Sequence, residues 1–285
     1  MGLKNIVVLT RKLLLLLTIL PALGVMHASV AEASDGLLKI TSGFDYSSGS
    51  YGQDVTTEIE YYPVTVEYFN DAWSAKLTVP YIKVTGNGTV VPGVSGPAMG
   101  GVGSVMVGVG PAPAPETTPT PTTVVDSGLG DVEASVAYAF FPELELIPFV
   151  ELRAKAKLGT ADEAKALGTG ENDYSVQVDG VFGRGSVQPF YTLGYIFVGD
   201  TSTVDYNDRF FGTAGLMFII NDHNNVGMTY DYKQASLDNA EDEGVAGIFL
   251  SSKLSSGWAV SISMSTGLTD NSPDYGGSLM VGREF

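Results

Sequence analysis

The chain of 285 residues has no cysteine and few charged residues for a soluble protein. The absence of cysteine excludes a disulfide scaffold, a thiolate-ligated metal or iron–sulfur site, a thiol nucleophile and a lipid-modified N-terminal cysteine. Charged residues make up 16% of the chain, against roughly a quarter in ordinary soluble proteins. The net charge of −17 argues against a nucleic-acid partner, because binding to phosphate requires a basic surface.

Catalytic motifs are also missing. The sequence contains only two histidines, and His223 lies in the polar turn Asn221–Asn225 with no serine at a useful spacing. No Gly-x-Ser-x-Gly, phosphate loop or His-Glu-x-x-His is found. We therefore predict that the protein is not an enzyme and that it has neither a cofactor nor a dedicated metal site.

Long hydrophobic runs are confined to the N-terminus. Lys4, Arg11 and Lys12 precede an apolar stretch from Leu13 to Val25, and Ala31-Glu32-Ala33 offers small residues for a signal peptidase. This pattern predicts a cleaved signal peptide at residues 1–33. The alternative is a retained membrane anchor, but the run is shorter than the ~20 residues of a spanning helix. No later stretch is apolar over ~18 residues, so we expect no membrane-spanning helix in the mature chain.

The rest of the chain, residues 34–285, alternates with a period of two residues. Strand 258–265, for example, places Trp258, Val260, Ile262 and Met264 on one face and only Ala and Ser on the other. This periodicity predicts an all-β protein. We expect twelve strands, near 37–47, 53–69, 72–85, 127–141, 146–159, 172–183, 187–199, 208–220, 225–236, 244–254, 257–268 and 275–285.

The connections between these strands alternate between short turns and longer acidic or glycine-rich loops. An even number of long amphipathic strands with short turns on one rim is typical of a transmembrane antiparallel up-and-down β-barrel of an outer membrane. Both termini would then lie on the periplasmic rim. A soluble β-sandwich produces the same alternation, but twelve long strands exceed what one sandwich core needs, and aromatic residues gather near strand ends as in interfacial girdles.

One connection is exceptional. Residues 87–126 are rich in glycine and then in proline and threonine, so they cannot join a β-ladder. This segment is either a loop folded into the barrel mouth as a constriction or a long external loop.

The alternation also predicts which side chains line the lumen. A charge that faces lipid at the bilayer midplane costs about 2–4 kcal/mol, so charged strand residues belong inside. A turn centred on residue 144 pairs Asp131 with Lys157, Glu133 with Lys155 and Ser135 with Arg153. A turn at Asn70-Asp71 pairs Glu67 with Lys76 and Thr65 with Thr78. The predicted lumen residues are Glu58, Glu60, Glu67, Lys76, Asp131, Glu133, Glu151, Arg153, Lys155, Lys157, Gln177, Asp179, Asp231 and Lys233. Pro63 suggests a bulge that would separate Glu58 and Glu60 in phase from Glu67.

These residues allow two interpretations. They line a polar, water-filled pathway for a solute, or they form a salt-bridged plug that fills a closed barrel. Twelve tilted strands enclose a backbone cylinder roughly 24 Å across, which suits small solutes. Only Ser34-Asp35-Gly36 separates the predicted cleavage site from the first strand, so we expect no plug domain and therefore passive transport.

The long loops carry many carboxylates, which could bind Ca²⁺ or Mg²⁺ beside lipopolysaccharide, although no spacing resembles a calcium loop. A solvated acidic rim is the interpretation that we favour. The residues concerned are Asp200, Asp205, Asp208, Asp238, Glu241, Asp242, Glu243, Asp270 and Asp274.

Several local motifs occur in a characteristic order. Asn70-Asp71-Ala72-Trp73 leads into Leu77-Thr78-Val79-Pro80-Tyr81, and Gly128-Leu129-Gly130-Asp131 opens a later strand. This order resembles the family of outer-membrane transporters associated with the meta-pathway of phenol degradation. The resemblance implies a twelve-stranded barrel that transports aromatic or other hydrophobic compounds, and it defines no binding residues.

The C-terminal Phe285 ends the last strand, which resembles the signal read by the outer-membrane assembly machinery, although Arg283 departs from its pattern. We therefore expect a passive outer-membrane channel for small organic solutes in a Gram-negative cell, in contact with membrane lipid, lipopolysaccharide and the assembly machinery. The alternative is a non-conducting structural barrel whose acidic loops serve surface interactions.

Overall fold

The structure is a computed structural model that describes residues 36–52, 55–70, 72–86, 123–141, 146–147, 149–202, 204–238 and 240–285. The predicted signal peptide at 1–33 lies outside the described residues, as does most of the connection at 87–126. Within the described ranges, no helix is long and apolar enough to cross a membrane.

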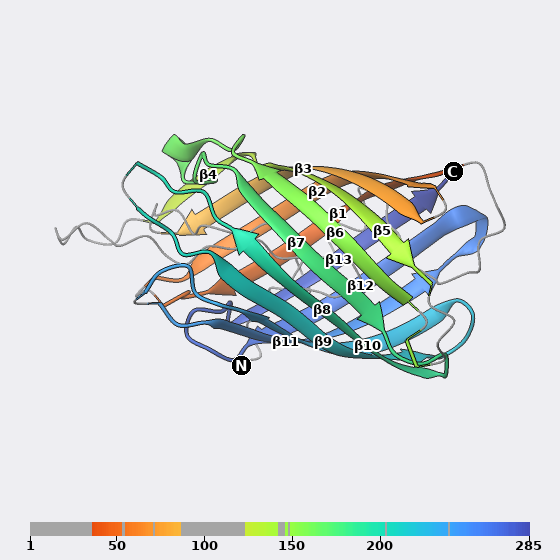
Figure 1. The fold of residues 1–285 in the computed structure, drawn as a ribbon. Coiled ribbons are helices and arrows are strands. Elements are labelled where there is room, and N and C mark those ends of the chain that lie inside the picture. Colours follow the sequence, from red (N-terminus) through yellow and green to blue (C-terminus); the bar gives the residue numbers. More distant parts are fainter. Residues whose placement is uncertain are drawn as a thin grey trace.

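The described chain forms one antiparallel sheet that closes on itself into a barrel of steeply tilted strands (Figure 1). Two single-turn 3-10 helices, η1 (Glu163–Lys165) and η2 (Ser255–Gly257), lie in its connections. The strands are β1 (Leu37–Gly49), β2 (Thr57–Asn70), β3 (Trp73–Gly86), β4 (Val124–Leu129), β5 (Val132–Phe140), β6 (Phe149–Leu158), β7 (Asp173–Val181), β8 (Val187–Phe197), β9 (Arg209–Ile219), β10 (Asn224–Lys233), β11 (Glu243–Lys253), β12 (Trp258–Gly267) and β13 (Tyr275–Glu284).

Apart from β4 and β5, strands that follow each other in the chain are neighbours in the sheet, and β1 pairs with both β2 and β13. The pairing of β2 with β3 completes the ring. Because β4 and β5 both pair with β3, at its two ends, they occupy one position, and the thirteen segments make a barrel of twelve strands. This confirms the predicted all-β, twelve-stranded antiparallel up-and-down barrel. It also shows that the strand predicted at 127–141 is interrupted, and that its first part begins at Val124, inside the predicted loop.

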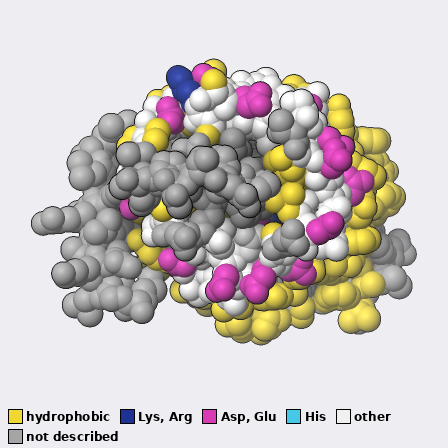
Figure 2. All heavy atoms as spheres, turned by 90° about the vertical axis from the view of Figure 1, so that its left-hand side faces the viewer, with side chains coloured by type: hydrophobic (Ala, Val, Ile, Leu, Met, Phe, Trp, Pro, Cys, Tyr) yellow, Lys and Arg dark blue, Asp and Glu magenta, His cyan; other side chains and the backbone are white. Residues whose placement is uncertain are grey.

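The two rims of the barrel differ in the length of their connections (Figure 1). The short-turn rim holds the C-terminus, the brief turns that follow β2, β7, β9 and β11, and the connection between β5 and β6. Gly183 and Gly257 adopt left-handed backbone conformations in two of these turns (φ 72° and 76°), where a residue with a Cβ atom would be strained. The long-loop rim holds the remaining connections, and acidic side chains are spread around it (Figure 2).

Candidate functional site

The two faces of the barrel wall have opposite character. In β2, for example, Val64, Val66 and Tyr68 are exposed on the outer face, whereas Thr65 and Glu67 are buried on the inner face. Figure 2 shows hydrophobic side chains over the outer wall. An apolar outer face and a polar inner face are what a barrel in lipid requires, because lipid cannot solvate charge. The interior therefore holds the candidate site.

Charged side chains of β5, β6 and β7 form a network across the inner wall. Lys155 Nζ lies 3.0 Å from Glu133 Oε2, and Lys157 Nζ lies 2.8 Å from Asp131 Oδ2 and 3.3 Å from Asp173 Oδ2. All of these charged groups are at most 13% exposed. The network therefore ties three strands together inside the barrel.

The register beneath this network differs from the prediction by two residues. Glu133 stands opposite Lys157 and Ser135 opposite Lys155, because the β5–β6 turn is centred one residue later than expected. The side chains nevertheless reach the predicted partners, because each lysine leans diagonally along its neighbouring strand. A shift of two residues also preserves the face of every side chain, whereas a shift of one would not.

Arg153 and Glu151 form the next part of the same wall. One guanidinium nitrogen of Arg153 donates to Glu151, and Nη1 lies 3.2 Å from Ser135 Oγ. Both side chains are almost completely buried, at 4% and 2% exposure. Asp179, which stands opposite Glu151 on β7, is satisfied by Gln177 and by the Thr192 hydroxyl rather than by a cation.

A second group of ion pairs connects β1, β2 and β3. Glu67 accepts from Lys76 at 3.3 Å and approaches Lys39 Nζ at 3.8 Å. Glu67 stands opposite Lys76, and the hydroxyls of Thr65 and Thr78, which are also opposite each other, lie 2.8 Å apart. The structure thus shows the pairings expected from the Asn70-Asp71 turn, although Asp71 itself lies outside the described residues.

Predicted lumen residues also lie on β10. Asp231 accepts hydrogen bonds from Thr213 and Thr229, at 2.6 and 3.0 Å. Lys233 forms an ion pair with Glu243 of β11. Glu243 is the one carboxylate of the predicted acidic rim that a strand turns inward, because it stands opposite Lys233 in the register.

Glu58 and Glu60 lie on the outer face, which corrects the prediction that they line the lumen. The pairing of β2 with β3 has one continuous register, with Pro63 opposite Pro80. Because Pro63 lacks an N–H, its pairing with β1 is interrupted locally, but it resumes in the same register, so no bulge changes the phase. Glu60 forms an ion pair of 2.9 Å with Lys83 on this outer face.

A bulge occurs instead at Gly130-Asp131, between β4 and β5. The register against β3 shifts by one residue between Leu129, opposite Tyr81, and Glu133, opposite Thr78. The Gly130 N–H donates to the Pro80 carbonyl at 2.9 Å. The extra residue turns the Asp131 carboxylate into the interior, where it accepts from Lys157 and from the Ala161 N–H at 2.9 Å. The Gly-x-Gly-Asp motif therefore places a charge inside the barrel.

The β6–β7 loop, residues 159–172, folds into the mouth at the long-loop rim. Its Leu167 packs in a buried apolar cluster with Tyr51 and with the inward-facing Ile59 and Ile82. Ala161 belongs to the same cluster, and its bond to Asp131 fastens the loop to the wall. This loop thus places apolar side chains against the inner wall at the mouth, whereas the two interpretations of the 87–126 segment concern residues that lie mostly outside the described ones.

The acidic loop residues mostly hold the loops together. Asp200 and Asp208 accept from the backbone N–H groups of Tyr206 and Val198, and Asp242 accepts from Ala235 N–H, at 2.7 to 3.0 Å. No group of three metal-ligating side chains occurs in the part of the chain that the structure describes. His223 is exposed in its turn, and its N–H donates to Asn221 Oδ1.

Sequence reasoning missed Arg209, the first residue of β9. It stands opposite Ile196 and shares the inner face with Phe211 and Thr213. Its side chain is 1% exposed, and its Nε and Nη2 atoms have no hydrogen-bond partner among the described residues. The period of two in β9 would have placed Arg209 inside once Thr213 was recognised as an inward residue.

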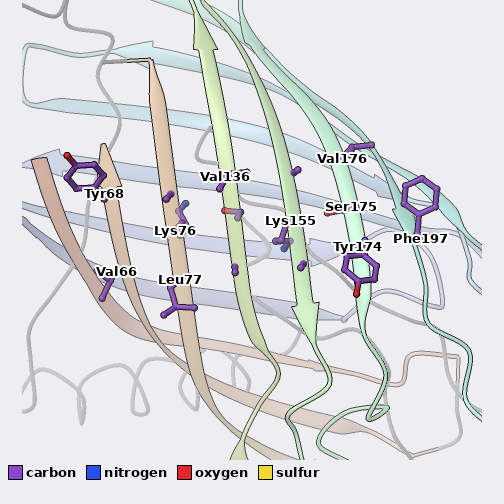
Figure 3. A pocket seen from close by; sticks show the side chains of 15 residues that line it. Val66, Tyr68, Lys76, Leu77, Val136, Lys155, Tyr174, Ser175, Val176 and Phe197 are labelled. Carbon is purple, nitrogen blue, oxygen red and sulfur yellow. The ribbon is translucent and has the colours of Figure 1, made fainter. Parts of the chain in front are cut away.

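A groove of about 640 Å³ lies on the outer wall (Figure 3). Outward alanines of β3, β5 and β6 form its floor, and Figure 3 shows Tyr68 at one side and Tyr174 and Phe197 at the other. The alanines are Ala75, Ala134, Ala154 and Ala156. Because it opens on the apolar face, this groove belongs to the lipid-facing surface and not to the interior.

No protein-family model matches the chain, and no curated protein matches its sequence significantly. Solved structures do resemble it. The COG4313 outer membrane channel from Pseudomonas putida F1 has a TM-score of 0.59 and 12% identity, over 88% of this chain and 94% of that chain. The KdgM porin has a TM-score of 0.52 and 9% identity, over 87% of this chain and 99% of that chain. The chain therefore has the fold of outer-membrane barrels that include channels.

Proposed function

We propose that the protein is a passive outer-membrane channel for small organic solutes. The main support for this proposal is the chain of ion pairs on the inner wall of a closed barrel whose outer wall is apolar. Such an interior offers water and polar solutes a route through lipid, and opposite charges on facing strands produce transverse fields that orient a permeating molecule. The channel fold of the two structural neighbours and the resemblance to transporters associated with the meta-pathway of phenol degradation support this proposal.

We infer that the attached β6–β7 loop sets the size limit of the proposed channel. Leu167 and Tyr51 pack at the mouth beside Ile59 and Ile82, and the Asp131–Lys157–Asp173 ion pairs lie next to the attached loop. A solute would pass an apolar entrance before it reaches the charged side chains of the ion pairs. This order favours small molecules with an apolar body and a polar group.

The proposed location follows from the same surfaces. The outer wall would contact membrane lipid and the acidic rim lipopolysaccharide, after export by the signal peptide at 1–33. Phe285, which exchanges backbone hydrogen bonds with Leu38 of the first strand, would present the C-terminal signal to the assembly machinery. Arg283, the departure from that signal, stacks between Trp258 and Phe285 at 5.4 and 4.9 Å from their ring centroids.

A non-conducting structural barrel is the second candidate, and one observation favours it. The inward charges are so deeply buried, with Glu151, Arg153 and Lys157 at most 4% exposed, that they could fill the interior instead of lining a pore. In that case the ion pairs would serve stability alone.

Swelling of liposomes that contain the refolded protein separates the two candidates. The channel proposal predicts swelling rates that fall steeply as the size of an uncharged solute increases. Leu167→Ser should raise the rates for the larger solutes, because it removes the apolar side chain that narrows the mouth. Asn207→Ser, a change elsewhere on the same rim, should leave the rates unchanged. Liposomes that swell no faster than protein-free ones would refute the channel.

A further inference from the structure

Among the described residues, the inner wall contains one deeply buried cation that the ion-pair network does not satisfy. Arg209 is 1% exposed, and no ion pair within 4 Å joins it to any part of the chain that the structure describes. In the same part of the chain, its Nε and Nη2 atoms have no hydrogen-bond partner. Removal of a guanidinium from water is unfavourable unless its donors are paired, so an unpaired buried arginine requires a physical explanation.

The nearest carboxylates are already engaged. Asp173 and Glu243 are the acidic groups that interact electrostatically with Arg209. Asp173 is held by Lys157 at 3.3 Å and by the Gly199 N–H at 2.9 Å, and Glu243 is held by Lys233. The described residues therefore leave Nε and Nη2 of Arg209 without a hydrogen-bond partner, and they place a second cation, Lys233, on the neighbouring strand.

Apolar side chains stand beside these donors. Ile196 lies opposite Arg209, Phe211 follows it on the inner face, and both are buried in one cluster with Val198. A planar guanidinium can pair with a carboxylate through two parallel hydrogen bonds, and apolar walls favour a ligand with an apolar body. A fully hydrated inorganic anion would gain nothing from such walls.

We propose that Arg209 is the residue that gives the channel a preference for small organic carboxylates, by binding the carboxylate group while Phe211 and Ile196 contact the apolar body. This inference rests on the proposed channel function, because a solute must enter the lumen to reach Arg209. The site lies at the long-loop end of the barrel, where β9 begins. A solute held there would be bound weakly and selectively before it moves further along the lumen.

Two probes of the same shape test the proposal on the refolded wild-type protein. Benzoate carries the carboxylate, whereas benzyl alcohol has the same ring without the charge. Benzoate should bind, as measured by calorimetry in detergent, at least tenfold more tightly than benzyl alcohol. Equal binding of the two probes, or no binding of benzoate, would overturn the proposal without the use of any variant.

Variants then assign the effect to the residue. Arg209→Gln should weaken benzoate binding at least tenfold and leave benzyl alcohol binding unchanged. Arg209→Lys keeps the charge for folding and should weaken benzoate binding by a smaller factor, because an ammonium cannot form the paired bonds. Lys253→Gln, which removes an inward cation opposite Ala259 at the other rim, should have no effect. Benzoate binding that is unchanged in the folded Arg209→Lys and Arg209→Gln proteins would overturn the assignment.

Bilayer recordings separate this inference from the proposed function. If the wild-type protein conducts and its reversal potential shows no preference for benzoate over chloride, the role of Arg209 is refuted and the channel stands. If it never conducts but binds benzoate through Arg209, the carboxylate site stands and the channel is refuted.

Discussion

Substitution of Lys157 tests whether the ion pairs of the inner wall are buried, because the cost of removing one partner depends on burial. Its Nζ lies between Asp131 and Asp173, at 2.8 and 3.3 Å, and all three side chains are at most 8% exposed. Lys157→Met leaves two buried carboxylates without their cation. Removal of one partner from a buried ion pair typically destabilises a protein by about 3–5 kcal/mol, so we expect a loss of that size.

The assay is urea unfolding of the protein in lipid vesicles, followed by tryptophan fluorescence. Lys165→Met is the matched control, because Lys165 pairs with Asp162 at 3.8 Å with both side chains 50% exposed. Loss of an exposed pair changes stability by about 0–1 kcal/mol. Asp131→Asn and Asp173→Asn, added to Lys157→Met, should restore most of the stability, because an amide retains the oxygen that accepts from the backbone. Equal effects of Lys157→Met and Lys165→Met would refute the reasoning and indicate that the Asp131–Lys157–Asp173 ion pairs are as well solvated as an exposed pair.

Other predictions concern the two faces and the pore. Val136→Arg places a charge on the outer wall and should lower the free energy of unfolding in vesicles by about 2–4 kcal/mol; an unchanged value would contradict the assignment of that face to lipid. Thr65→Val should destabilise the barrel by about 1 kcal/mol in the same assay, and adding Thr78→Val should recover part of this loss, because the pair is bonded at 2.8 Å. Lys155→Glu with Lys157→Glu should shift the bilayer reversal potential toward cation permeation if the wall lines a pore. Unchanged selectivity with a sharply lower melting temperature would decide for a plug. The unheated protein should migrate faster than the boiled protein on a gel, since a closed barrel leaves no free strand edge, and identical migration would count against the closed barrel.

Most of the fold could be predicted from the two-residue periodicity of the sequence. It predicted the twelve strand positions and the face of charged residues such as Lys155 and Asp231. The face is predictable because a change of face would move a charged side chain from the polar interior to the apolar outer wall. The exact register of β5 against β6 could not be predicted from the periodicity, because it depends on the conformation of the turn between them. Residue pairs such as Glu133 and Lys155 still meet, since long side chains reach diagonally across two positions.

The errors have local causes. Pro63 suggested a bulge, but a proline in this barrel interrupts only the pairing on one side and leaves the phase of Glu58 and Glu60 unchanged. The bulge at Gly130-Asp131 went unrecognised because its signal, two glycines before an acidic residue, also fits an ordinary turn. Folding of Leu167 into the mouth depends on tertiary packing, which periodicity does not encode.

The most direct test of the proposed channel is the recording of current across a planar bilayer after insertion of the purified, heat-modifiable protein. We expect stepwise, ohmic increases in conductance that are small for a twelve-stranded barrel, because Leu167 and the buried ion pairs narrow the lumen, and that increase in the Leu167→Ser variant. A folded protein that inserts into the membrane and never conducts, as wild type or as Leu167→Ser, would contradict the channel proposal and favour the non-conducting structural barrel.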